Sequence, residues 1–211
     1  MNADLTTQLS ALTHLGAGWI MWLLIALSVA SVAVMVERTI VLLRSRDDIA
    51  RLRRELLPHL FARDYHRAGR VVAQSRSYEA RVLTAGLEVV QDGATTAEQR
   101  MAGASTLARL AMEKRLAFLG TVGSNAPFVG LLGTVIGIVR SFAALEASGG
   151  KVSASLMSEV GEALIATAIG ILVAIPAVAA FNAFQRIIKA RLSNADALSR
   201  ELLAQLGSNR V

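Results

Sequence analysis

A carboxylate and two hydroxyls lie within stretches of the sequence that are otherwise apolar. Glu162 precedes an uncharged run of 23 residues, Thr167 follows it five positions later, and Thr134 lies in an earlier uncharged run of 24 residues. A carboxyl at the centre of a membrane span is unfavourable by roughly 2.5–3.5 kcal/mol, so such residues usually face a protein interior or a wet cavity. A space shared by one carboxylate and two hydroxyls could hold water and relay a proton.

Each of these residues also has a simpler interpretation. Glu162 lies 20 residues before Asn182, which is about 30 Å along a helix, so it could be a carboxylate at the outer membrane interface. A lone Thr in a span commonly bonds to the backbone of its own helix. Thr134, however, lies about 9 Å from the end of its run at Arg140, and the next run is antiparallel. Thr134 and Thr167 can therefore meet at a similar depth near Glu162, which favours a proton pathway.

Three uncharged runs are long enough to place these residues in a bilayer, which takes about 20 residues to cross. They cover residues 15–36, 116–139 and 163–185. A signal peptide is a poor interpretation of the first run, because residues 1–18 contain no Lys or Arg. The composition, 54% hydrophobic, is also typical of a membrane protein.

Positive charge is distributed unevenly between the segments that separate the runs. Residues 44–115 carry 14 Lys and Arg against 9 Asp and Glu, and 5 more Lys and Arg follow residue 185. The connector 141–158 carries only Lys151. Because Lys and Arg accumulate in cytoplasmic loops, we expect the middle segment and the C-terminus in the cytoplasm and the N-terminus in the periplasm. This topology explains the net charge of +6, so nucleic acid is not an expected partner.

The pattern predicts an all-α membrane protein with three transmembrane helices and long helices that extend into a cytoplasmic helical domain. The expected segments are a periplasmic tail at 1–14, transmembrane helix 1 at 15–43, a cytoplasmic helical domain at 44–115, transmembrane helix 2 at 116–140, a periplasmic connector at 141–158, transmembrane helix 3 at 159–185 and a cytoplasmic C-terminal helix at 186–211.

The cytoplasmic segment has helical spacing throughout. We expect the first span to continue as an amphipathic helix up to Pro58. Asp92 and Gly93 form a turn signal, and Thr95 and Glu98 form a capping-box pattern at the start of the next helix. No helix breaker separates that helix from the second span, so the two are expected to form one long helix.

Small residues recur on one face of the second and third spans. In lipid, small residues let helix backbones approach closely, so helix packing is the simpler interpretation and the lining of an assembled pore is the alternative. Each proline within a span frees one backbone carbonyl and indicates a kink or a carbonyl that faces the pore. The candidates for packing or kinks are Gly130, Gly133, Gly137, Gly170, Pro127 and Pro176.

The first span has no such stripe and is expected to face lipid, so Leu24→Ala should be mild. No catalytic, metal or cofactor site is predicted for the chain. It has no cysteine, and its three histidines lack metal-ligand spacing. The glycines of residues 130–137 lack the lysine of a phosphate-binding loop.

The sequence resembles the MotA/TolQ/ExbB proton channel family, most closely its ExbB and TolQ branches, in the stretches VERTIVLLR, APFVGLLGTVIGIVRSF and GEALIATAIGILVAIPAVAAFN, one for each span. The resemblance implies a homo-pentamer in the bacterial inner membrane that encloses single-span ExbD- or TolR-like subunits with an intramembrane Asp. It also implies that Glu162 is the family's span-three Glu and that Thr134 and Thr167 are its pore-lining threonines.

Three processes remain open on this resemblance. TonB-dependent outer-membrane import, Tol-type envelope maintenance and gliding motility would each use proton motive force, the first two through a TonB- or TolA-like protein. An alternative of another class is a structural membrane scaffold that conducts no protons.

Overall fold

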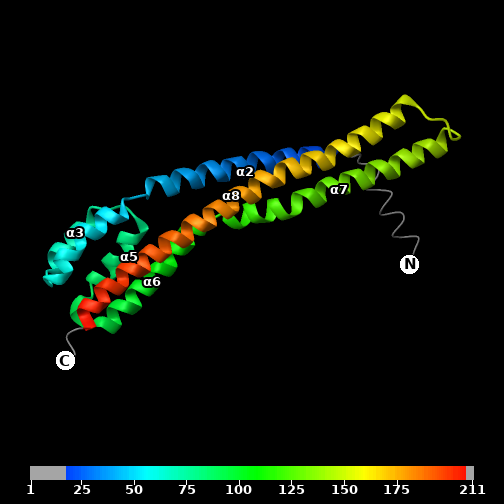
Figure 1. Cartoon of the computed structure of the whole chain (residues 1–211). Coiled ribbons are helices and arrows are strands. Elements are labelled where there is room, and N and C mark those ends of the chain that lie inside the picture. The colour runs from blue at the N-terminus through cyan, green and yellow to red at the C-terminus, as the bar shows by residue number, and fades with distance from the viewer. Residues whose placement is uncertain (1–17, 208–211) are drawn as a thin grey trace, which may run out of the picture. The chain divides into compact units, whose positions relative to one another are not determined.

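The structure, a computed structural model, describes residues 18–207 of the chain. Within that range it contains helices and no strand, which confirms the all-α prediction. The predicted tail at 1–14 and the ends of the outermost predicted helices, at 15–17 and 208–211, lie outside the described residues. The helices are α2 (Gly18–Arg44), α3 (Ile49–Phe61), α4 (Tyr65–Ala73), α5 (Tyr78–Leu87), the 3₁₀ helix η1 (Val90–Asp92), α6 (Ala94–Glu113), α7 (Leu116–Ala147) and α8 (Ala154–Gly207) (Figure 1).

These helices divide into two units. The span unit contains α2 up to Met35, α7, and α8 up to Asn182. The bundle unit contains the rest of α2, all of α3 to α6, and α8 from Ala183. Both α2 and α8 therefore contribute residues to the two units.

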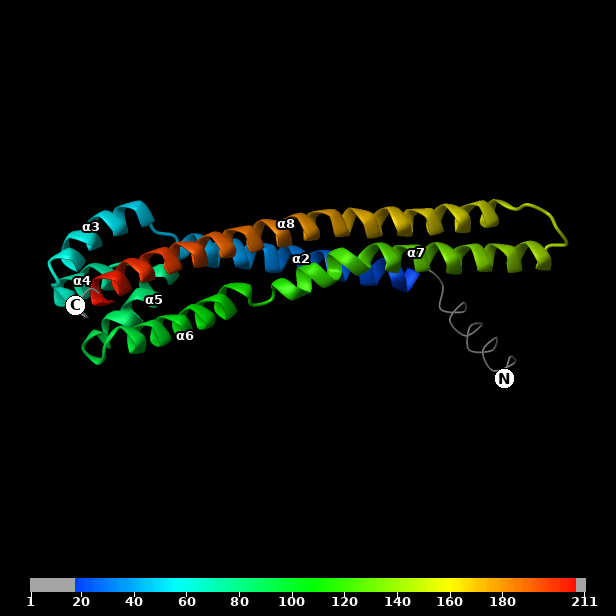
Figure 2. The same cartoon turned by 60° about the horizontal axis from the view of Figure 1, so that its bottom comes forward.

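The span unit consists of three helices that are long and apolar enough to cross a membrane. In Figures 1 and 2 the helices α7 and α8 lie side by side and run antiparallel. The turn between them contains Gly149 and Gly150 at φ 65° and 84°, a backbone region that glycine enters without steric penalty. Many large apolar side chains of these three helices are exposed, as expected of helices that contact lipid.

The first span is more deeply packed than its sequence indicated. Ile20 and Leu24 of α2 are fully buried and join a cluster with Val122, Ile136 and Val173. The expectation that Leu24→Ala would be mild is therefore wrong, because truncation of a fully buried Leu typically costs about 2–5 kcal/mol.

The bundle unit is built from short amphipathic helices that pack around the C-terminal part of α8 (Figure 1). Each helix supplies a few fully buried side chains, for example Leu56 of α3, Leu83 of α5 and Leu202 of α8. Arg53 of α3 also donates from Nε to Glu201 of α8 at 2.8 Å. The predicted helical domain thus has its own small hydrophobic core.

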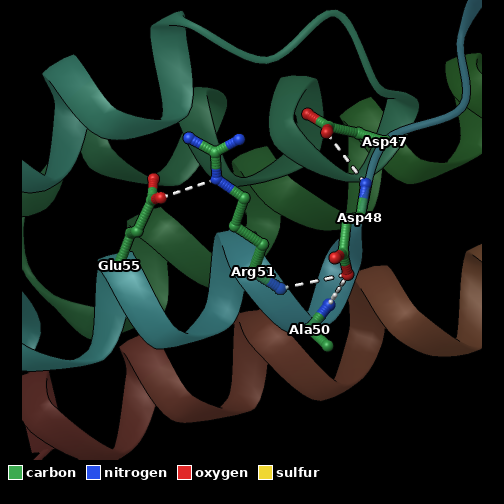
Figure 3. Close-up of polar contacts among 5 residues, drawn as sticks. All are labelled: Asp47, Asp48, Ala50, Arg51 and Glu55. Carbon is green, nitrogen blue, oxygen red and sulfur yellow. Dashed lines mark hydrogen bonds and ion pairs between the residues drawn. The ribbon is translucent and has the colours of Figure 1, made fainter.

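The helix that was expected to run from the first span to Pro58 is broken. α2 ends at Arg44, and Asp48 caps a new helix by accepting hydrogen bonds from the backbone N–H groups of Ala50 and Arg51 at 3.0 and 3.1 Å (Figure 3). A side-chain cap of this kind satisfies N–H groups that have no partner inside the helix. α3 then continues through Pro58 and ends at Phe61.

The expected single helix into the second span is also broken. α6 ends at Glu113, and Arg115 adopts a left-handed conformation at φ 64° before α7 begins. This conformation is uncommon for any residue other than glycine. No helix breaker occurs at this position, since Arg is a good helix former.

The start of α6 also differs from the prediction. The helix begins at Ala94, and no side chain caps its N-terminus, so the capping box of Thr95 and Glu98 is wrong. Gly93 precedes it at φ 95°. The turn signal at Asp92 and Gly93 is confirmed. α6 begins directly after this turn, one residue before Thr95.

Candidate functional site

The backbones of α7 and α8 approach each other closely at several glycines. A Cβ atom added at Gly130 would lie 2.7 Å from the carbonyl oxygen of Ala166 and 2.9 Å from the Cα of Thr167. One added at Gly170 would lie 2.6 Å from the carbonyl oxygen of Ala126. The two backbones therefore touch at these glycines, and a larger residue would force them apart.

The same contact continues toward the α7–α8 turn. An added Cβ atom at Gly133 would lie 2.8 Å from the Cβ of Ala166, and one at Gly137 would overlap the Cβ of Ala163. The stripes of small residues therefore meet each other within one chain, as the packing interpretation requires. Thr134 lies on the same face of α7, one turn beyond Gly130.

The two hydroxyls of the predicted site lie along this contact but differ in their hydrogen bonding. Thr134 is 8% exposed and donates to the backbone carbonyl of Leu131 at 2.7 Å. The Oγ1 atom of Thr167 is buried and has no hydrogen-bond partner. A buried hydroxyl without a hydrogen-bond partner typically costs about 1–3 kcal/mol of stability. Thr167 is such an unsatisfied polar group, and it lies opposite Gly130.

The carboxylate of the predicted site points elsewhere in the single chain. Glu162 is exposed. It precedes Thr167 by five residues, which is about 140° around a helix of 3.6 residues per turn. The structure thus brings Thr134 and Thr167 to the α7–α8 contact and leaves Glu162 on a free surface of α8.

A second carboxylate, near the start of α8, was not predicted. Glu159 lies 4.0 Å from Arg140 of α7, and its Oε2 atom is buried without a hydrogen-bond partner. Arg140 precedes the turn between α7 and α8, and Glu159 follows it. Opposite charges at these positions were therefore a usable signal in the sequence. This pair joins α7 and α8 near the turn that connects them.

The prolines of the two spans do not end their helices. Pro127 lies within α7 and Pro176 within α8, and both helices continue through them. Within residues 18–207, no group of three or more His, Cys, Asp or Glu side chains is placed to hold a metal ion.

The helices that carry these small and polar residues, α7 and α8, also match a known protein family. The model of the MotA/TolQ/ExbB proton channel family matches residues 74–197, which is 124 of the 211 residues. The chain belongs to this family. The match includes all of α7 and the whole part of α8 that lies in the span unit.

Individual relatives within the family come from two branches. The chain is 44% identical over 91 residues to the biopolymer transport protein ExbB of Xanthomonas campestris, which is 43% of this chain and 36% of that protein. It is 47% identical over 77 residues to the putative biopolymer transport protein ExbB-like 2 of Helicobacter pylori, which is 36% of this chain and 51% of that protein.

A third relative is the Tol-Pal system protein TolQ of Pseudomonas aeruginosa, 52% identical over 73 residues, or 35% of this chain and 32% of that protein. The matched stretches span between about a third and a half of the length of these three relatives. The family and its ExbB/TolQ branch are thus supported, and the relatives divide between ExbB and TolQ.

Proposed function

We propose that the chain is a subunit of a proton-driven motor in the bacterial inner membrane. Five copies would surround the single membrane helices of ExbD- or TolR-like subunits, and protons would pass inward beside Thr134 and Thr167 to an Asp on those helices. The N-terminus would lie in the periplasm and the C-terminus in the cytoplasm, as the distribution of Lys and Arg favours.

The observation that carries this proposal is the hydroxyl of Thr167. Its Oγ1 atom is buried in an apolar helix without a hydrogen-bond partner, whereas Thr134 is satisfied by its own helix. Buried polar groups almost always have a partner. A water molecule or a polar group from a neighbouring helix would complete the hydrogen bonding of Thr167, and either one would extend a polar path into the membrane.

The exposure of Glu162 supports the participation of other chains. A carboxylate exposed on α8 is unfavourable next to lipid, and such residues usually face a bundle interior or a water-filled cavity. The single chain offers no such environment at this position, because the residue is exposed. A ring of subunits around a central pore would provide it.

The process that the motor would energise depends on whether the chain acts like ExbB or like TolQ. The similarity to ExbB proteins supports TonB-dependent outer-membrane import, and the similarity to a TolQ protein supports envelope maintenance. We favour import, with a TonB-like protein as the final partner.

A scaffold without proton conduction has one observation in its favour. The small residues of α7 and α8 contact each other within one chain, so packing alone accounts for them. Packing does not account for Glu162, which makes no contribution to this contact. Proton flux therefore distinguishes the two functions.

The test is reconstitution in liposomes with a pH-sensitive dye inside. We expect little proton leak from this chain alone and proton-coupled activity when an ExbD- or TolR-like subunit is added. Glu162→Ala should abolish that activity and leave assembly intact, and Glu162→Asp should retain part of it. Normal activity of a well-assembled Glu162→Ala variant would contradict the assignment, and absence of flux with every partner would favour the scaffold.

A further inference from the structure

A buried carboxylate in the bundle unit has no role in the proposed proton pathway. Glu79 lies in the first turn of α5, and only 3% of it is exposed. Its Oε2 atom is buried and has no hydrogen-bond partner. A charged group in this position is unfavourable unless it is paired.

A cation whose charge lowers the pKa of this carboxylate bonds other groups instead. Arg191 of α8 is 8% exposed and donates from Nη2 to the carbonyl of Leu42 at 2.7 Å. From Nη1 it donates to the carbonyl and the hydroxyl of Ser45 at 3.3 and 2.8 Å. The last carbonyls of a helix have no partner within it, so Arg191 holds the C-terminal end of α2 to α8.

Both side chains line one pocket of ≈ 470 Å³. The other charged groups on its wall are Arg46 and Asp47, directly after α2, while α3 contributes Ile49. The pKa of Glu79 is raised, chiefly by burial; its own backbone N–H and the charge of Arg191 lower it, and Asp47 raises it further. While Arg191 is bonded to the end of α2, the effect of desolvation on the pKa of Glu79 thus outweighs the effect of the Arg191 charge.

We propose that Glu79 and the end of α2 compete for Arg191, so that α2, α5 and α8 form a proton-dependent clasp. When Glu79 is protonated, Arg191 bonds the carbonyls of Leu42 and Ser45, and the end of α2 is fixed. When Glu79 loses its proton, the buried carboxylate attracts Arg191 across the pocket, and the last turn of α2 loosens. No bond other than hydrogen bonds changes, and the proton leaves to solvent through the pocket.

The direction of the pH effect follows from the raised pKa. A carboxyl whose pKa is higher in the folded protein than in the unfolded chain contributes stability that is present below the unfolded pKa, about 4.3 for Glu. That contribution is lost as the pH rises through the folded pKa. The clasp is therefore closed on the acidic side of that pKa and open on the basic side.

The test is hydrogen exchange at the backbone amides of Ser45 and Arg46, which bond the carbonyls of Val41 and Leu43 at 3.2 and 3.1 Å. Protection factors, corrected for intrinsic exchange, are measured on the full chain in detergent from about pH 5 to about pH 8. We expect them to fall as the pH rises through the folded pKa of Glu79.

The variants separate the clasp from a merely structural role. Glu79→Gln keeps the shape and cannot ionise, so protection should stay high at every pH. Ser45→Ala removes one acceptor of Arg191, so protection should be lower at every pH and keep its dependence on pH. Equal pH dependence in Glu79→Gln and the unchanged chain would overturn the proposal.

A second measurement covers the case in which Glu79→Gln fails to fold. The carboxyl carbon of Glu79 is titrated by NMR in the unchanged chain, and its midpoint is compared with that of the Ser45 and Arg46 exchange. Coincident midpoints support the clasp. Separate midpoints, or exchange independent of pH, refute it.

Discussion

Gly170→Ala tests the contact on which the geometry of the span unit depends. A Cβ atom at this position would lie 2.6 Å from the carbonyl oxygen of Ala126 and 3.1 and 3.3 Å from the Cα and N atoms of Gly130. All three are backbone atoms, so no side-chain rotation can relieve the overlap. α7 and α8 would have to separate along the stripe that holds Thr134 and Thr167.

The magnitude can be isolated with a matched control on the same helix. A Cβ atom at Gly161 would meet nothing within 4 Å. Both Gly→Ala changes gain up to about 1 kcal/mol in helix propensity, while only Gly170→Ala overpacks the contact, which typically costs about 1–3 kcal/mol. The two variants should therefore differ in free energy of unfolding by about 1–3 kcal/mol, with Gly161→Ala the more stable.

The assay is unfolding of the purified protein in mild detergent with increasing sodium dodecyl sulfate, followed by circular dichroism. Fluorescence of Trp19 and Trp22 on α2 provides a second probe of the span unit. A Gly170→Ala variant as stable as Gly161→Ala would refute the close crossing of α7 and α8, and with it the placement of Thr134 opposite α8.

Three further predictions concern other parts of the chain. Asp48→Ala removes the cap of α3, so thermal unfolding should show a loss of about 1 kcal/mol, whereas Asp48→Asn should be nearly neutral. Gly93→Ala forces alanine to φ 95° and should destabilise the chain by about 1–3 kcal/mol. The control Gly103→Ala lies in open space within α6 and should not destabilise the chain. Equal melting temperatures of the two variants would contradict this prediction. In reconstituted vesicles with a partner subunit, Thr167→Val should reduce proton flux strongly and Thr167→Ser should preserve it, and identical behaviour of the two variants would show that Thr167 only packs.

Much of the helical architecture was predictable because its signals are local. The three spans follow from uninterrupted apolar length, and the turn at Asp92 and Gly93 follows from residues that favour a reversal of the chain. The small residues at Gly130 and Gly170 recur at helical spacing, so their packing role was also predictable. The family resemblance carried by the second and third spans was confirmed by the match to residues 74–197.

The helix ends were less predictable, for two different reasons. Asp48 before an apolar run is a capping signal that was overlooked in favour of a continuous helix. Arg115, in contrast, gives no local signal, because a left-handed conformation runs against the steric preference of arginine. The buried face of α2 at Ile20 and Leu24 was hidden for a related reason, since a span of uniform apolar character does not reveal which side contacts protein.

The sequence by itself determined that polar residues occur in the second and third spans, because side-chain type is independent of conformation. Only the tertiary structure decided how each one is satisfied. Thr134 bonds its own helix, the hydroxyl of Thr167 is buried without a partner, and Glu162 is exposed. Burial and hydrogen bonding depend on which residues of a distant segment come into contact, and this pairing is set by the close fit of small residues between antiparallel helices.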